Sequence, residues 1–257
     1  MVDFINAKDC FPQNSVSGGV NYFLWDRDHP GNCEITTVIA GEYDTEKRKL
    51  NEFDSFVRYN IAVEVIRKIQ DSSFEPLSAL VSSRNPFGYP TSERGNKTRK
   101  QGDYILVSSR GVGYVNPSTL ESGENMAGRY NVMVSRIVYE HAGEPDKEGK
   151  LRVLSKIQVL KPGEVCTDSY LAIGSFETED EANNLANYLK TKTARFLIAQ
   201  TLSSINLSKE KFCFVPQIDW KQPINDSEIY KRYGLTDKEA NFIEAMIHPF
   251  DRGELNA

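Results

Sequence analysis

Residues 169–202 have the sequence SYLAIGSFETEDEANNLANYLKTKTARFLIAQTL and contain the transition on which the predicted fold depends. The run 169–175 is short and has the composition of a strand. A long helix is predicted to follow at 178–202, where Thr178 and Glu181 have the spacing of a capping box. Its apolar side chains recur at helical spacing, at Ala182, Leu185, Leu189, Phe196 and Leu197. This stretch therefore indicates a mixed α+β fold.

The segments on either side of this transition differ in character. From about residue 77 to 175 the chain is predicted to be β-rich with irregular loops. Its short β-type runs are separated by Gly, Pro, Asn and Ser, and they lie at 104–108, 112–115, 131–139, 151–160 and 169–175. A helix capped by Asp54 or Ser55 is predicted at 53–70. Beyond residue 202 we expect a strand at 212–215, a helix at 226–232 and a C-terminal helix from 236 to 247.

The first forty residues consist of short strand-like runs. One such run lies at 2–5, and an apolar and aromatic run at 18–25 follows a glycine pair. Residues 26–31 predict a turn, so the run at 33–40 is expected to pair with 18–25. Isolated strands need neighbours to be stable. We therefore assign Gly18, Gly19, Tyr22 and Trp25 to structure, packed against further sheet.

Bulk composition is that of an ordinary globular protein. The chain has 257 residues, of which 39% are apolar and 26% charged, and no apolar run is long enough to span a membrane. The start has no secretory signal, and the four cysteines are far apart and match no CxxC or zinc-type spacing. Reduced thiols and a cytoplasmic location are expected. The net charge of −5 does not exclude nucleic acid, because phosphate contacts need only a local basic surface.

One loop has such a local basic surface. Within seventeen residues it carries Arg84, Arg94, Lys97, Arg99 and Lys100, opposed only by Glu93. Cations of this kind neutralise phosphates, while Arg84 and Asn85 can pair with base edges, and Phe87 or Tyr89 can stack on a base. Composition alone favours a solvated flexible loop equally. A second cluster, formed by Lys190, Lys192 and Arg195, is a weaker candidate because cations near a helix end also stabilise the helix dipole.

No segment has the pattern of a catalytic or metal site. Residues 85–88, Asn-Pro-Phe-Gly, lack the second proline of an amino-methyltransferase motif and do not follow an apolar strand. Residues 111–113, Gly-Val-Gly, are too short for a cofactor loop. In 145–150, Pro-Asp-Lys-Glu-Gly-Lys, the acids are too close together for a nuclease, and a solvated turn fits better. No catalytic residue and no metal are expected in this chain.

Several separated runs together resemble one family. Residues 2–12 followed by 18–27 are similar to the last strands of the catalytic domain in restriction–modification N6-adenine methyltransferases, including the large fused restriction–methylation polypeptides. In that family this segment leads into a target-recognition domain. An early loop of that domain resembles 82–88, its long helix resembles 188–197, and its C-terminal closure resembles 214–220, 229–236 and 242–244. The resemblance thus extends, in ordered blocks, over nearly the whole chain.

The resemblance implies a division of the chain and a function. Residues 1–40 would be a remnant of the methyltransferase catalytic sheet, and residues 41–257 a DNA target-recognition domain. The family's S-adenosylmethionine loop and its Asn-Pro-Pro-aromatic motif are absent. We therefore expect double-stranded DNA and a methyltransferase catalytic domain, in the same or a separate chain, as partners. No cofactor is expected here, and S-adenosylmethionine belongs to the missing catalytic domain.

Two alternatives from other classes stay open. The chain could be a divergent restriction enzyme or methyltransferase that is active by itself, which bound S-adenosylmethionine or metal-dependent DNA cleavage would indicate. It could also be a protein-interaction module that docks to a methylase subunit and never touches bases. Duplex binding without salt dependence would favour this second alternative.

Overall fold

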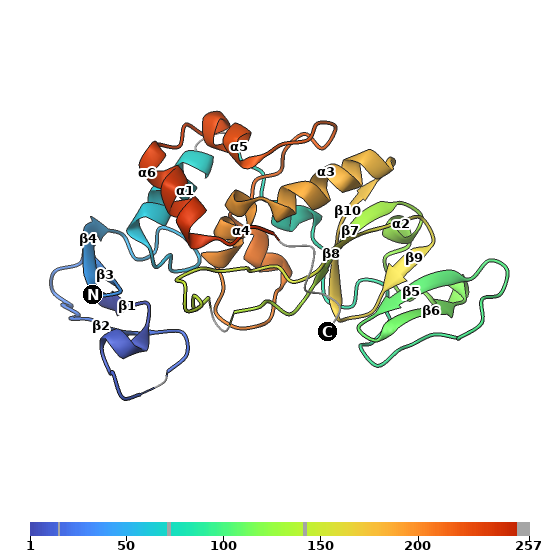
Figure 1. Cartoon of the computed structure of the whole chain (residues 1–257), viewed down its shortest axis with the longest axis horizontal. Coiled ribbons are helices and arrows are strands. Elements are labelled where there is room, and N and C mark those ends of the chain that lie inside the picture. Colours follow the sequence, from blue (N-terminus) through green and yellow to red (C-terminus); the bar gives the residue numbers. More distant parts are fainter. Residues whose placement is uncertain (15, 71–72, 141–142, 251–257) are drawn as a thin grey trace.

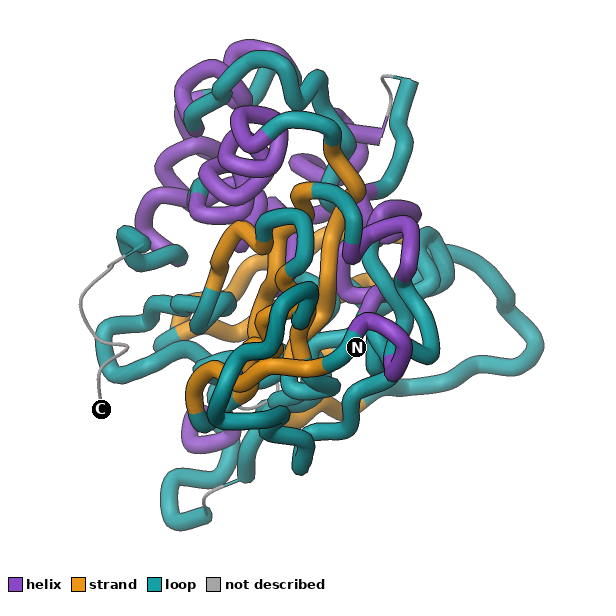
Figure 2. The backbone as a smooth tube through the Cα atoms, turned by 90° about the vertical axis from the view of Figure 1, so that its right-hand side faces the viewer, coloured by secondary structure: helices purple, strands orange, loops and turns teal. Residues whose placement is uncertain are grey.

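The computed structural model describes residues 1–14, 16–70, 73–140 and 143–250. Three small sheets and a set of helices form an elongated body, with the N-terminal sheet at one end and the sheet containing β5 and β6 at the other (Figure 1). Seen from that second end, most helices gather on one side of the strands and long loops on the other (Figure 2). The predicted mixed α+β fold is confirmed.

The N-terminal sheet has the strand order β2-β1-β3-β4. Its strands are β1 (Val2–Phe4), β2 (Val20–Tyr22), β3 (Cys33–Ile39) and β4 (Glu42–Arg48). β1 pairs parallel with β3 and antiparallel with β2, so it lies between the two strands that were expected to pair with each other. That prediction was wrong because a turn predicts only that two runs are connected, and β1 takes the place beside β3. β4, which was not predicted, follows residue 40 in the chain and pairs antiparallel with β3.

The middle of the molecule is an antiparallel sheet with the order β10-β7-β8. It consists of β7 (Tyr130–Ser135), β8 (Ile157–Leu160) and β10 (Tyr170–Phe176), all within predicted β-type runs or one residue beyond them. Successive side chains point to opposite faces. Val132 and Val134 belong to one hydrophobic cluster, while Met133 between them belongs to the other. This sheet is therefore buried on both faces and is shared by two cores.

A third sheet has the order β6-β5-β9. β5 (Tyr104–Ser108) and β6 (Gly111–Val115) form an antiparallel hairpin close to the predicted runs. β9 (Glu164–Cys166) was not predicted and pairs parallel with β5. Leu106, Val165 and Met133 are fully buried in the same cluster, so the third sheet packs against one face of the middle sheet.

The structure differs from prediction at the start of α1 and at residues 212–215. α1 (Asn60–Gln70) begins later than expected because the carbonyls of Val57 and Arg58 accept hydrogen bonds from Arg48 and Thr37 of the N-terminal sheet. The expected strand at 212–215 is wrong: a 3-10 helix spans Lys209–Phe212 and turns follow. Phe212, Phe214 and Val215 are all buried. The run therefore lacks the alternation of buried and exposed side chains that a half-buried strand shows.

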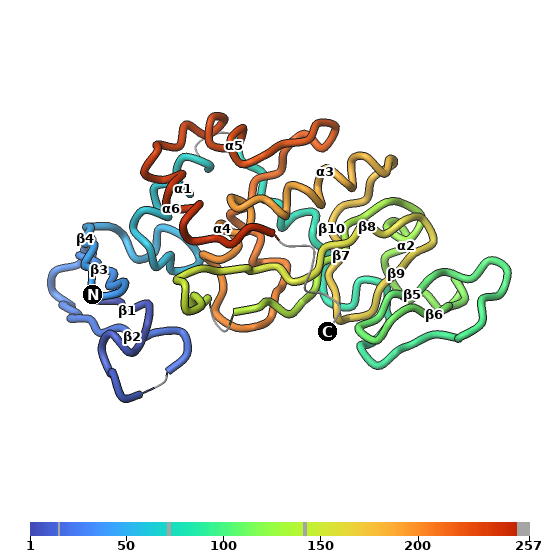
Figure 3. Tube along the Cα trace, viewed as in Figure 1, coloured from blue at the N-terminus to red at the C-terminus, as the bar shows by residue number. Residues whose placement is uncertain are grey.

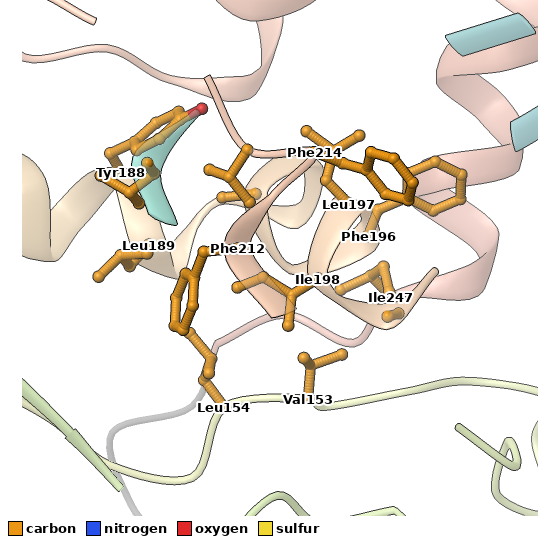
Figure 4. Close-up of a cluster of buried hydrophobic side chains, with 14 of the residues drawn as sticks. Val153, Leu154, Tyr188, Leu189, Phe196, Leu197, Ile198, Phe212, Phe214 and Ile247 are labelled. Carbon is orange, nitrogen blue, oxygen red and sulfur yellow. The ribbon is translucent and has the colours of Figure 1, made fainter. Parts of the chain in front are cut away.

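The predicted long helix is two helices, α3 (Glu179–Lys190) and α4 (Lys192–Ala199), with Thr191 between them. The capping box of Thr178 and Glu181 is present at the start of α3. α5 (Asp226–Arg232) and α6 (Asp237–Met246) match their predictions, and a one-turn α2 (Glu124–Ala127) precedes β7. Figure 4 shows part of the larger core, where side chains from α3, α4 and the 212–214 and 153–154 segments surround one interior.

Candidate nucleic-acid interface

The basic loop is held directly on the outer edge of β6. Asn96 and Tyr114 exchange two backbone hydrogen bonds of 2.7 and 3.0 Å. A Cβ atom at position 113 would lie 1.8 Å from the carbonyl oxygen of Arg94, so only glycine allows the loop to lie this close to the strand. Figure 3 shows this loop as the teal-to-green trace beside β5 and β6. The loop is thus fixed by the sheet, whereas composition alone left a flexible loop equally favoured.

Three of its cations are accessible at the surface, although the Arg99 guanidinium also donates to the carbonyl of Asp103 at 3.4 Å. Lys97, Arg99 and Lys100 are exposed, and the Arg99 guanidinium lies over the Tyr114 ring at 5.9 Å. Arg94 is half-buried and donates from Nη1 to the carbonyls of Thr91 and Glu93, so it braces its own loop. The segment 97–100 is therefore the part of the loop that can meet phosphates.

The predicted stacking residues do not fit that role. Phe87 has no exposed surface and Tyr89 is 5% exposed; both belong to the core between the middle and third sheets. The Tyr89 hydroxyl is 2.9 Å from Oγ1 of Thr119. Asn85 has a φ of +56°, its backbone N–H donates to Asp168 at 2.8 Å, and its Oδ1 is buried. As a correction, these three side chains shape the loop and its core and are not presented to DNA.

The second predicted cluster is also structural. Arg195 is 1% exposed. Lys192 pairs with Glu244 of α6, and Lys190 donates to Asn187 at 3.3 Å. These contacts join α3, α4 and α6, so the assignment of Lys190, Lys192 and Arg195 to DNA is not supported by their placement. The physical reason is burial and pairing, which helical spacing cannot show.

The structure brings the predicted Arg84 together with two charged residues that the sequence did not single out, Arg136 and Asp168. Arg84 is 69% exposed at its side chain and donates to Oδ2 of Asp168 at 2.7 Å. Arg136 Nη1 forms an ion pair with Oδ1 of the same carboxylate at 2.9 Å and donates to the backbone carbonyl of Asp168 at 2.7 Å. Burial acts to raise the pKa of Asp168, but the hydrogen bonds from Arg84 and Asn85 and the charge of Arg136 lower it on balance.

This cluster borders a pocket of about 340 Å³, lined among others by Ser109, Arg136, Ile137, Asp168 and Tyr170. We call it the junction pocket, because residues of the β5–β6 hairpin and of the middle sheet both line it. The Lys156 ammonium lies 5.3 Å from the centre of the Tyr170 ring, which adds a third cation beside it.

A sequence signal for this cluster existed. Arg136 follows the last residue of β7, and Asp168 precedes the first residue of β10 by two positions. β7 and β10 are antiparallel neighbours, so the end of one lies beside the start of the other. A prediction that β7 pairs with β10 would have placed Arg136 and Asp168 side by side at the same end of the sheet.

Two features of the described residues bear on catalysis and metal binding, namely the loop 85–88 and the grouping of His, Cys, Asp and Glu side chains. The loop 85–88 cannot present a stacking aromatic to a substrate amine, because Phe87 is fully buried. Within the described ranges, no three His, Cys, Asp or Glu side chains are grouped to hold a metal ion. Over the same residues, no helix has the length and apolar character needed to cross a membrane.

Comparison with known proteins gives one partial similarity. No protein-family model matches the chain. Over 71 residues, or 28% of its length, the chain is 34% identical to an uncharacterized adenine-specific methylase of Mycoplasma pneumoniae (strain ATCC 29342 / M129 / Subtype 1). The matched segment spans 15% of the length of that methylase. Part of this chain is therefore related in sequence to a protein described as an adenine-specific methylase.

Proposed function

We propose that this chain is the DNA-recognition module of a restriction–modification adenine-specific DNA methyltransferase and positions duplex DNA for a separate catalytic domain. The observation that carries the proposal is the set of exposed cations Lys97, Arg99 and Lys100 on a loop fixed to β6. The similarity to an adenine-specific methylase supports the class of enzyme that the module serves. S-adenosylmethionine and methyl transfer belong, in this proposal, to the catalytic domain.

Electrostatics favour a local contact despite the acidic chain. The net charge of −5 is spread over 257 residues, whereas segment 97–100 concentrates three cations in four positions. Attraction between exposed charges decays over about 10 Å at 0.1 M salt, so distant carboxylates weaken such a patch only slightly. Phosphate contacts also make binding salt-dependent through counterion release.

The test is fluorescence anisotropy of a labelled random-sequence duplex at several salt concentrations. We expect dissociation constants on the order of 10⁻⁶–10⁻⁴ M for the whole chain, weakening as salt rises. The triple variant Lys97→Ala, Arg99→Ala, Lys100→Ala should reduce the slope of log affinity against log salt by up to about three. The matched control is Lys47→Ala, Lys49→Ala, Lys238→Ala, which removes three exposed cations far from this loop.

The proposal fails if the two triple variants lose affinity equally, because the effect would then reflect net charge alone. It also fails if the duplex does not bind to the wild-type chain at low salt. A catalytic alternative predicts instead that S-adenosylmethionine binds with measurable heat in calorimetry.

A second candidate function, docking to a methylase catalytic domain, is favoured by the apolar surface beside β2. Tyr22, Phe23, Leu24 and Trp25 are 59%, 68%, 93% and 75% exposed. β2 is an edge strand, so its open backbone groups can also pair with a further strand. Contiguous exposed aromatics of this kind mark interaction surfaces in soluble proteins.

This docking is compatible with DNA recognition, and its test uses the opposite end of the molecule. The variant Phe23→Ser, Leu24→Ser, Trp25→Ser should keep the melting temperature of the chain but lose co-elution with the methyltransferase catalytic domain of the same restriction–modification system. Tyr43→Ser is the matched control, since Tyr43 is 69% exposed on β4 at the other edge. Unchanged co-elution of the triple variant would exclude this surface.

A further inference from the structure

The backbone of Arg136 is fixed by hydrogen bonds at the end of β7, the central strand of the middle sheet. Its N–H donates to the carbonyl of Ser169 at 3.0 Å, and its carbonyl accepts from the N–H of Leu207 at 2.7 Å. The next residue, Ile137, forms a bridge with Asn206. The start of the Arg136 side chain is therefore held between β10 and the 205–207 segment. Binding groups carried by such fixed elements lose little entropy when a ligand arrives.

The guanidinium of Arg136 is paired at one end only. Nη1 is held by the carboxylate and the carbonyl of Asp168. Nε is buried, and no described residue accepts a hydrogen bond from it. A buried donor without an acceptor is costly, and this cost is removed when a ligand supplies the acceptor. The part of the guanidinium that does not contact Asp168 therefore has no hydrogen-bond acceptor among the described residues, and it can bind an acceptor that a ligand brings.

The surroundings of this guanidinium favour an anion. Arg136 and Asp168 line the junction pocket, Arg84 is bonded to Asp168, and Lys156 lies over the Tyr170 ring that also lines it. Three cations against one carboxylate give the cluster a net charge of about +2. The side chain of Arg136 is 14% exposed and that of Arg84 is 69% exposed, so Arg136 is the more recessed of the two cations.

We propose that the guanidinium of Arg136 binds a DNA backbone phosphate in the junction pocket. This deepens the proposed function and rests on it. Phosphates protrude from a duplex and carry charge, so they suit a recessed cationic group. Base edges are uncharged and lie inside the grooves, where a protruding side chain is needed. Asp168 acts here as a positioning residue, because it fixes one end of the guanidinium and leaves the other end open.

The test compares Arg136→Met and Arg136→Lys with the control Arg129→Met. Arg129 lies just before the other end of β7, is exposed and pairs with Glu177. On random duplex DNA we expect Arg136→Met to weaken binding about tenfold and to reduce the salt slope by about one, equally on all sequences. Arg136→Lys should have an intermediate effect, because it keeps the charge but loses the planar guanidinium. Arg129→Met should bind like the wild type.

A second readout does not depend on variant stability. In ¹H–¹⁵N spectra of the wild-type chain, the arginine Nε–Hε resonance that Arg136→Lys removes should shift when duplex DNA or inorganic phosphate is added. The proposal is overturned if neither probe shifts that resonance, or if the variants lose affinity only for duplexes with a particular guanine. A shift with phosphate but no binding of DNA to the wild type would support the pocket and refute the proposed function.

Discussion

At the residue scale, Arg195 shows how a buried cation is stabilised by backbone carbonyls, with no contact to a carboxylate among the described residues. Its guanidinium donates to the carbonyls of Lys190, Thr191, Arg152 and His248. Burial lowers the pKa of Arg195 to about 10, so the group stays charged at neutral pH. The guanidinium thus links the end of α3 and the start of α4 to the segments that contain Arg152 and His248. Its five donors, rather than its charge, explain its position.

Replacing Arg195 should therefore affect stability and not DNA binding. Arg195→Met leaves four carbonyls without their donor, and we expect the free energy of unfolding to fall by about 2–4 kcal/mol. Urea denaturation followed by circular dichroism measures this change. For the remaining folded protein, anisotropy should give wild-type affinity for duplex DNA. A variant of normal stability with weakened DNA binding would contradict this assignment.

Glu239 belongs to the N-terminal cap of α6, and its ionisation makes the stability of the fold depend on pH. Its carboxylate, 7% exposed, accepts from Lys68 at 2.6 Å and from the N–H and hydroxyl of Thr236. Burial acts to raise the pKa of Glu239, but these hydrogen bonds lower it on balance from its ordinary value of 4.5. A carboxyl group with a lowered folded-state pKa stabilises the fold above pH 4.5. That contribution is lost as the pH falls through the folded-state value.

We expect Glu239→Gln to be less stable than the wild type by about 1–3 kcal/mol at pH 7. Because the wild-type advantage comes from the ionised carboxylate, it should shrink below pH 4.5 and vanish at lower pH. Urea unfolding at pH 7, 5 and 3.5 tests both statements. Glu148→Gln, in an exposed turn, serves as the control and should show a small difference at every pH. A pH-independent loss would mean that packing, not charge, is responsible.

At the element scale, the break between α3 and α4 depends on a distant side chain. Thr191 is both the C-cap of α3 and the N-cap of α4, and its hydroxyl donates to the carbonyl of Tyr188. The carboxylate of Asp226 accepts from the backbone N–H groups of Lys192 at 2.9 Å and Thr193 at 2.8 Å. These N–H groups would have intrahelical partners in a continuous helix. The break is therefore stabilised by α5, which contributes Asp226.

Asp226→Asn should destabilise the chain by about 1–2 kcal/mol, because it removes one acceptor and the charge at the start of α4. The helix content measured by circular dichroism should stay unchanged, since α3 and α4 keep their other packing. Asp237→Asn, at the first position of α6, is the control and should cost less. Equal losses for both variants would show that Asp226 contributes no more than an ordinary helix-terminal charge.

At the scale of the whole molecule, two hydrophobic cores share the middle sheet. Val132 and Met133 are adjacent in the chain, fully buried and members of different cores. Neither core can lose this sheet and keep its packing. The third sheet and the helical part should consequently unfold in one cooperative step.

Val132→Ala and Met133→Ala test this coupling. Each should cost about 2–4 kcal/mol through lost burial and a residual cavity. Each variant should also show one unfolding transition at a lower denaturant concentration. Far-ultraviolet circular dichroism and amide exchange of β5 should report the same loss of stability. If Met133→Ala melted β5 while the helical part kept its wild-type transition, the two cores would be independent units.

The sequence by itself determined the elements whose signals are local. The capping box before α3, the bounds of α5 and the run of β5 depend on neighbouring residues, so one-dimensional patterns predict them. Only the tertiary structure decided which strands pair, where the long helix breaks, and which cations face solvent. Those outcomes depend on residues far apart in the chain, such as Asp226 at the break and Asp168 beside Arg136. Burial and pairing are properties of three-dimensional neighbours, and spacing along the chain does not contain them.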